Sequence, residues 1–253
     1  MADSRERLIV ALDVPNAPEA RRIVAAIGDS AQIYKVGKQL FTAEGPQVVR
    51  DLVASGRDVF LDLKYHDIPN TVAGAVGIAA QLGVRMLTVH ASGGLRMMKA
   101  AVEAAGTVWP GSPTQERGSE IRATRPLVLA VTVLTSLNDE DLAEIGVSGR
   151  VVDQALRLAA LARNAGCGGV VSSAREVREI RREVGSGFAI VTPGIRPAGD
   201  AKGDQERVVT PTEAIAAGAS HIVVGRPITA SSDPSASARR ILDEIASVSP
   251  IPA

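Results

Sequence analysis

Short apolar runs rich in valine, isoleucine and leucine recur along the chain, separated by alanine-rich stretches with helical spacing. The runs predict eight β-strands, at residues 8–13, 33–37, 59–63, 86–90, 126–133, 169–172, 188–192 and 221–225. The stretches between them predict helices at residues 17–27, 71–82, 95–105, 150–165, 175–184 and 212–217. Strands that alternate with helices pair in parallel, so the pattern predicts an α/β fold with a parallel sheet.

Eight strand–helix units within 253 residues favour a (β/α)8 barrel, the TIM barrel, formed as a single domain by residues 1–253. The alternative is an open doubly wound sheet, but no Gly-x-Gly-x-x-Gly follows the first strand. Two segments interrupt the alternation: a polar, turn-rich excursion at residues 109–124 and a long connection at residues 192–210. We expect the second segment to be a lid over the catalytic face.

Composition and charge narrow the possible partners. Lysine plus arginine and aspartate plus glutamate balance at 28 each, and 2% of residues are aromatic, so no nucleic acid partner is expected. No apolar run approaches the ~18 residues of a membrane span, and residues 1–7 lack a signal-peptide stretch, which predicts a cytoplasmic protein with no membrane partner. The single Cys167 excludes an internal disulfide and is expected to be buried and inert.

The strongest chemical signal is the run Asp-Leu-Lys-Tyr-His-Asp-Ile-Pro-Asn-Thr at residues 62–71, where the third strand ends. Residues two apart share a face of a strand, so Asp62 and Lys64 point the same way as Phe60. In a sheet covered on both faces, that direction is the interior or a pocket mouth. Buried charges are costly even when paired, so the pair favours chemistry over the alternative, a structural ion pair.

Charged residues also mark the two neighbouring strands, because Asp13 follows the first strand and Lys35 lies in the second. Enzymes with this fold work at the carboxyl ends of the strands. We therefore expect one cluster of charges, formed by Asp13, Lys35, Asp62, Lys64 and Asp67. Alternation of sign along it creates a preset electrostatic field rather than a proton-sharing pair.

A second group of residues fits a phosphate. Gly225 and Arg226 end the eighth strand, where backbone N–H groups can approach an anion and arginine can bind it with two hydrogen bonds. Gly194, Arg196 and Gln205, on the long connection, are expected to close over the same group. The alternative for Arg226 is a surface role.

Three residues near these motifs are weaker candidates. His66 and His90 are explained as well by orienting or structural roles as by catalysis, and Glu44 is expected to begin a helix, where a carboxylate complements the dipole. No metal site is expected, since lysines adjacent to Asp13 and Asp62 oppose a magnesium ion.

Taken together, the motifs resemble those of the bacterial orotidine 5'-phosphate decarboxylase family. The matching segments are residues 11–13, 34–37, 62–71, 89–94, 131–136, 192–197, 203–205 and 224–227, which span nearly the whole chain. The Asp-x-Lys-x-x-Asp core also occurs in a sugar-phosphate decarboxylase of the same fold. Its extension to Thr71 and the motifs after strands seven and eight are specific to the resemblance.

The resemblance implies decarboxylation of orotidine 5'-monophosphate (OMP) to UMP in de novo pyrimidine biosynthesis, without a cofactor. Lys64 would protonate C6 of the pyrimidine, and Asp62 would lie beside the departing CO2. Lys35 would bridge Asp62 and the ribose, while Asp13 would accept a hydrogen bond from a ribose hydroxyl.

The resemblance also implies a homodimer with shared active sites. Asp67 and Thr71 would reach the partner's site, where Asp67 would complete the charge network. Thr135 would lie near the pyrimidine. The phosphate would be held by Arg196, Gln205, Gly225 and Arg226.

Two alternatives stay open. A magnesium-dependent decarboxylase or aldolase of sugar phosphates would need a further acidic ligand near Asp62 and would lose activity with a chelator. A non-catalytic barrel that binds a nucleotide phosphate would keep Arg226 but need not combine Lys35, Asp62 and Lys64.

Overall fold

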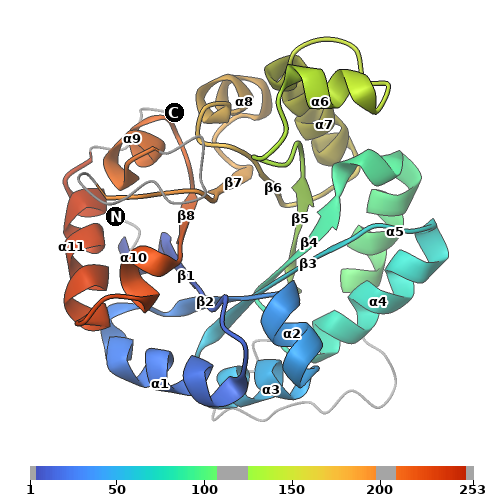
Figure 1. The fold of residues 1–253 in the computed structure, drawn as a ribbon. Helices are drawn as coiled ribbons and strands as arrows, with labels where there is room; N and C mark the ends of the chain where they lie inside the picture. The colour runs from blue at the N-terminus through green and yellow to red at the C-terminus, as the bar shows by residue number, and fades with distance from the viewer. Residues whose placement is uncertain (1–3, 107–124, 198–208, 249–253) are drawn as a thin grey trace.

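The computed structural model describes residues 4–106, 125–197 and 209–248, and within them eight parallel strands close into a barrel in chain order (Figure 1). The strands are β1 (Leu8–Ala11), β2 (Ile33–Gly37), β3 (Asp58–Tyr65), β4 (Met86–His90), β5 (Leu127–Val131), β6 (Gly169–Val171), β7 (Ala189–Thr192) and β8 (His221–Val224). Since β8 also pairs with β1, the predicted (β/α)8 barrel is confirmed.

Helices surround this barrel on the outside (Figure 1). They are α1 (Ala17–Ile27), α2 (Lys38–Glu44), α3 (Gln47–Ala54), α4 (Pro69–Gln81), α5 (Gly94–Ala105), α6 (Asp139–Glu144), α7 (Val151–Asn164), α8 (Val177–Val184), α9 (Pro211–Ala216), α10 (Arg226–Thr229) and α11 (Pro234–Ala246). All six helices predicted by their residue ranges are present. The helix expected to begin at Glu44 corresponds to α3, which begins three residues later, whereas α2, α6, α10 and α11 were not predicted. Among the described helices, none has the length and apolar character that a membrane crossing requires.

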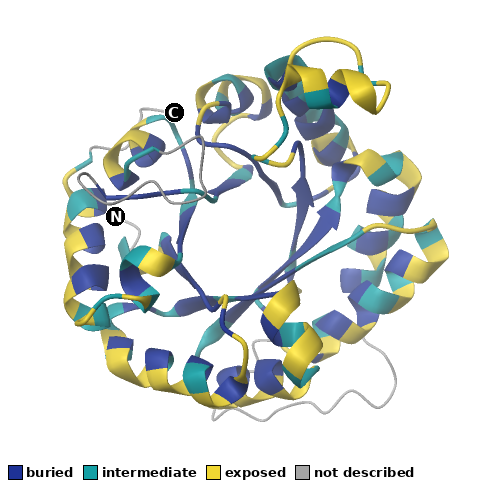
Figure 2. Cartoon of the chain, in the orientation of Figure 1, coloured by how far each residue is buried: buried dark blue, intermediate teal, exposed yellow. Residues whose placement is uncertain are grey.

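The central residues of each strand are buried on both faces, which explains why the strands appear in the sequence as continuous apolar runs (Figure 2). One set of side chains, including Ile9, Phe60 and Met86, packs inside the barrel. The alternate set, including Val10 and Leu61, packs between the strands and the helices.

Strand β3 is longer than predicted and carries an irregularity near its end. Leu61 pairs with Leu87 and Tyr65 pairs with Val89, so four steps along β3 match two steps along β4. Within this bulge Lys64 has φ 54°, and it is the one non-glycine of the described chain with positive φ. A left-handed conformation costs an L-residue about 1–2 kcal/mol. Residues with such strained backbones are concentrated at functional sites.

The barrel closes where the two ends of the described chain meet. Leu8 of β1 pairs with Ile222 of β8. The Arg7 guanidinium donates to the carbonyl oxygen of Ala219 at 2.8 Å, across 212 positions of sequence. The side chain of His221 lies at the same seam.

Two predictions outside the barrel have different outcomes. Glu44 ends α2 rather than beginning a helix, because the chain is already helical from Lys38 and stops at Gly45. Its carboxylate still complements a helix dipole, since it accepts a hydrogen bond from the backbone N–H of Ala17, the first residue of α1, at 2.8 Å. Cys167 is buried as expected, and burial raises the pKa of its thiol to about 12.

Candidate active site

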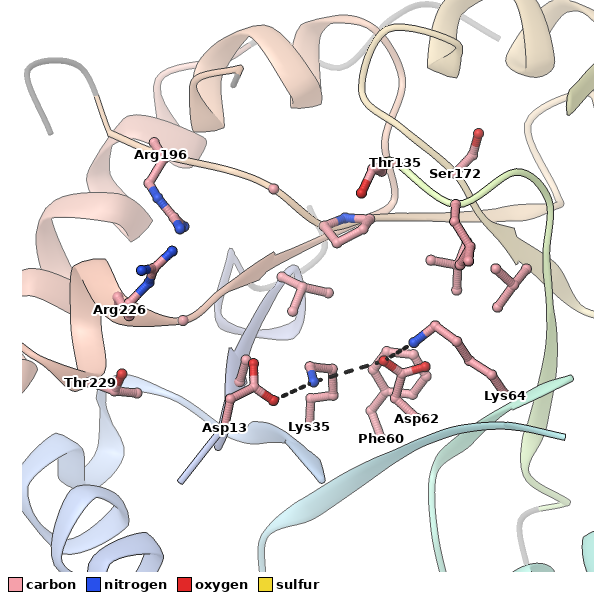
Figure 3. A pocket seen from close by; sticks show the side chains of 18 of the residues that line it. Asp13, Lys35, Phe60, Asp62, Lys64, Thr135, Ser172, Arg196, Arg226 and Thr229 are labelled. Atoms are coloured by element: carbon pink, nitrogen blue, oxygen red, sulfur yellow. Dashed lines mark hydrogen bonds and ion pairs between the residues drawn. The ribbon is translucent and has the colours of Figure 1, made fainter. Parts of the chain in front are cut away.

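A cavity of about 400 Å³ opens at the carboxyl ends of the strands (Figure 3). Apolar side chains such as Phe60 and Val171 form its walls. Its charged lining residues are Asp13, Lys35, Asp62, Lys64, Arg196 and Arg226. The sequence predicted all six of these as site residues, and the fold brings them to one cavity.

Four of the charged side chains form a continuous array of alternating sign (Figure 3). The Lys35 Nζ lies 2.8 Å from Asp13 Oδ1 and 3.8 Å from Asp62 Oδ2. On its other side, Asp62 Oδ2 lies 2.7 Å from Lys64 Nζ. The Asp62 side chain is 11% exposed and that of Lys35 is 12% exposed. The array therefore sets two ammonium groups against one buried carboxylate in fixed positions.

Strand order explains why these residues meet. Ala11 of β1 is in register with Lys35 of β2, and Gly37 at the end of β2 is in register with Asp62 of β3. Asp13 follows β1 by two residues and is exposed at the cavity mouth.

Thr88 is a buried neighbour of the charge array that the sequence analysis missed. Its hydroxyl donates to Asp62 Oδ1 at 3.0 Å and accepts from the backbone N–H of Lys64 at 2.9 Å. A signal was present, because Thr88 shares the interior face of β4 with Met86 and is a polar residue in an otherwise apolar run.

At the opposite end of the cavity, the guanidinium groups of Arg196 and Arg226 face one another (Figure 3). Arg196 follows β7 and is buried, while Arg226 is exposed and begins α10 directly after Gly225. Gly194 has φ 77°, a left-handed conformation that glycine adopts without strain. Two convergent guanidinium groups favour a doubly charged anion such as a phosphate monoester.

Two predicted site residues, Asp67 and Thr71, are not among the residues that line the cavity. Asp67 is exposed, and its carboxylate accepts a hydrogen bond from the backbone N–H of Ile68 at 2.6 Å. Thr71 is exposed in the first turn of α4. The prediction that Asp67 joins the charge cluster is wrong within one chain, because the backbone leaves the barrel after Tyr65.

Of the remaining candidate residues, some lie in the described part of the chain and others do not. Thr135, which the resemblance places near the pyrimidine, lines the cavity. Gln205, the 109–124 excursion and most of the predicted lid lie outside the described residues.

His66 and His90 pack ring against ring with centroids 5.4 Å apart. Burial, together with the charges of His66 and Lys64, lowers the pKa of His90. Within the described ranges, no group of three His, Cys, Asp or Glu residues is arranged to hold a metal ion.

The chain is similar in sequence and in structure to known proteins. Residues 6–241 match the model of the orotidine 5'-phosphate decarboxylase / HUMPS family. The chain is 52% identical over 243 residues to orotidine 5'-phosphate decarboxylase of Alkalilimnicola ehrlichii, covering 96% of this chain and 97% of that protein. It is 49% identical over 243 residues to the enzyme of the same name from Moorella thermoacetica, covering 96% and 93%. The crystal structure of orotidine 5'-phosphate decarboxylase from Lactobacillus acidophilus aligns with a TM-score of 0.80 at 40% identity, covering 94% and 98%.

Proposed function

The chain belongs to the orotidine 5'-phosphate decarboxylase / HUMPS family, and we propose how its cavity performs the decarboxylation of OMP. The protein is an enzyme of pyrimidine biosynthesis that converts OMP to UMP and CO2. The observation that carries the mechanism is the charge array facing the two arginines across one cavity. OMP has the matching polarity, with a phosphate at one end and a carboxylate on the pyrimidine at the other.

The array supplies what the reaction needs at C6. Loss of CO2 breaks the bond between C6 and the carboxylate carbon and leaves the electron pair on C6. The Lys64 ammonium stabilises this developing charge and then donates a proton to C6, forming the C–H bond of UMP. Lys64 afterwards regains a proton from water. Since Asp62 already fixes the ammonium, little reorganisation accompanies the reaction.

The other lining residues bind the rest of the nucleotide. Arg196 and Arg226 hold the phosphate, and this distant binding energy lowers the barrier at C6 when it is realised in the transition state. Asp13 and Lys35 hydrogen-bond the ribose hydroxyls, and Thr135 contacts the pyrimidine. No step in this scheme requires a cofactor.

The proposal includes a homodimer with shared sites. Asp67 and Thr71 lie exposed where α4 begins, and two large apolar side chains on the same segment are also exposed, Ile68 at 66% and Ile78 at 58%. Exposed apolar surface of this kind is typical of protein interfaces. A two-fold contact through α4 would bring Asp67 of each chain toward the cavity of the other. A cytoplasmic location fits the biosynthetic role.

A direct assay separates this function from the sugar-phosphate chemistry of the same family. OMP is added with EDTA present, and the absorbance of the orotate ring is followed. We expect turnover of OMP at the same rate with and without EDTA, and no turnover of sugar phosphates. Absence of OMP turnover, or its loss on chelation, would overturn the proposal.

The phosphate assignment is tested by Arg226→Ala. Hydrogen bonds to charged groups contribute about 1.5–3 kcal/mol, so kcat/KM for OMP should fall roughly ten- to a hundredfold. The value for the nucleoside orotidine should change little, because it has no phosphate to bind. Arg50→Ala, at an exposed position of α3, is the control. Equal losses for nucleotide and nucleoside would make Arg226 structural.

A further inference from the structure

One buried hydroxyl connects the two residues at the centre of the array. Thr88 is 0% exposed, in the middle of β4. It accepts a hydrogen bond from the Lys64 backbone N–H and donates one to Asp62 Oδ1. The direction of both bonds is fixed, because a backbone N–H can only donate and an ionised carboxylate can only accept. The single hydroxyl proton and a lone pair of Thr88 are therefore both committed to the array.

The bulge in β3 explains why Lys64 uses this hydroxyl. A bulge leaves residues of one strand without partners in the ladder. The register shift lies between Leu61 and Tyr65, so Lys64 is inside it. Its N–H donates a hydrogen bond to the hydroxyl of the Thr88 side chain on β4, at 2.9 Å. A residue keeps a left-handed backbone only where contacts with the surrounding structure hold it in that conformation. The hydrogen bond to Thr88 is one contact that holds Lys64.

The same hydroxyl orients the carboxylate. Asp62 Oδ1 is held by Thr88, while Oδ2 faces Lys64 Nζ at 2.7 Å and Lys35 Nζ at 3.8 Å. Rotation of the carboxylate about its Cβ–Cγ bond would break the bond to Thr88. The hydroxyl therefore keeps Oδ2 directed at both ammonium groups.

We propose that Thr88 is a positioning residue for the decarboxylation, fixing the carboxylate of Asp62 and the backbone of Lys64 relative to each other. Thr88 is absent from the residues that line the cavity, so it acts through these two neighbours. The inference rests on the proposed function, since the geometry that Thr88 maintains is the geometry of proton donation to C6.

The test compares Thr88→Val, which has the same shape without the hydroxyl, with Thr88→Ser, which retains the hydroxyl. Misplacing catalytic groups by about 1 Å costs on the order of 10²-fold, so kcat of Thr88→Val should fall roughly 10- to 100-fold. Its KM for OMP should change by less than about threefold, because the phosphate contacts remain. Thr88→Ser should recover most of kcat. This split between kcat and KM distinguishes positioning from general destabilisation.

Thr132→Val is the matched control. Thr132 is also buried and donates its hydroxyl to the carbonyl oxygen of Val171 at 3.2 Å. That carbonyl also accepts the Thr132 backbone N–H at 3.1 Å, so it keeps a partner in the variant. The control measures the effect of replacing a barrel hydroxyl by a methyl group, and thermal unfolding of every variant is recorded beside the kinetics. If Thr88→Val does not fold, Thr88→Ala is measured in its place.

The outcomes separate the inference from the function on which it rests. A wild-type protein that does not turn over OMP contradicts the proposed function. If the wild-type protein is active but Thr88→Val keeps the kcat of Thr132→Val, the positioning role is wrong. It is also wrong if Thr88→Ser is as impaired as Thr88→Val.

Discussion

The backbone and the side chain of Lys64 serve one arrangement. The left-handed backbone lies in the β3 bulge, and the ammonium reaches back 2.7 Å to the carboxylate of Asp62, two residues earlier. In a regular strand, side chains two residues apart stand parallel to each other on the same face of the sheet. The bulge therefore re-aims the lysine across the mouth of the cavity.

Lys64→Ala should lower turnover of OMP at least about 10²-fold, because the developing charge at C6 loses a stabilising group. Loss of the proton donor adds to this effect. Affinity for UMP should persist, since Arg196 and Arg226 remain. Single-turnover absorbance measurements and UMP titration check both parts. Lys38→Ala, at an exposed position after β2, is the control. Turnover of Lys64→Ala within a few-fold of wild type would remove the assigned role.

The position of a site residue could be predicted from the sequence where it depends only on the order of the strands and on the alternation of side chains along them. Lys35 and Asp62 are on the same faces as apolar interior positions of adjacent strands, so alternation and topology located them. Thr88 escaped notice because threonine within an apolar run is also an ordinary β-former. Asp67 was misplaced because spacing along the sequence does not reveal that the chain turns away from the barrel after β3.

Helices and strands were predictable where burial determines which positions are apolar. The strands, buried on both faces, have continuous apolar sequences. By contrast, α2 buries only Leu40, so its sequence has no apolar stripe to recognise. Helix α10 begins at Arg226, within the phosphate-site motif, and its four residues are too few to show a helical period. The bulge in β3 is set by pairing with β4, a tertiary effect that local pattern does not encode.

Gly169 shows how closely neighbouring strands approach. A Cβ at this position of β6 would lie 2.3 Å from the Ala189 carbonyl oxygen and 2.8 Å from Leu129 Cδ2. Overpacking typically costs about 1–3 kcal/mol, so Gly169→Ala should lower the Tm by roughly 2–12 °C. Gly187→Ala is the control, because no atom of the described residues beyond its chain neighbours lies within 4 Å of the added Cβ. If Gly169→Ala and Gly187→Ala had the same Tm, the barrel would accommodate the added methyl group at Gly169 without loss of stability.

At the scale of the whole molecule, the shared-site proposal makes a quantitative prediction. Homodimers of Lys64→Ala and of Asp67→Ala should each be nearly inactive. A mixed dimer has one cavity with both residues intact and one cavity with neither. Random exchange of equal amounts makes about half of the dimers mixed, which predicts roughly a quarter of wild-type activity. If exchange is confirmed and activity does not return, Asp67 acts within its own chain.

The seam of the barrel should make stability depend on pH. His221 Nδ1 donates to the Glu6 carbonyl oxygen at 2.7 Å, and desolvation by burial is the main cause that lowers the pKa of this imidazole. The unfolded chain, with a histidine pKa of about 6.5, then binds the proton more readily than the folded protein. The free energy of unfolding should therefore fall as pH decreases from about 6.5 toward the folded pKa.

Urea unfolding of wild type and His221→Asn between pH 8 and pH 5 tests this contribution. The variant lacks the titrating group, so its stability relative to wild type should improve as the pH falls below about 6.5. A difference in stability that is constant across the range would mean that His221 does not contribute to the pH dependence.

The contact from Arg7 to Ala219 spans 212 positions, so the barrel cannot close until nearly the whole chain exists. A ribosome adding about 5–20 residues per second needs roughly 10–40 s to synthesise this stretch. During that interval β1 has no β8 to pair with, and an unpaired strand edge can recruit other strands. At four residues, Leu8–Ala11, β1 is a poor template for such recruitment, so its brevity protects the nascent chain from aggregation until the last strand arrives.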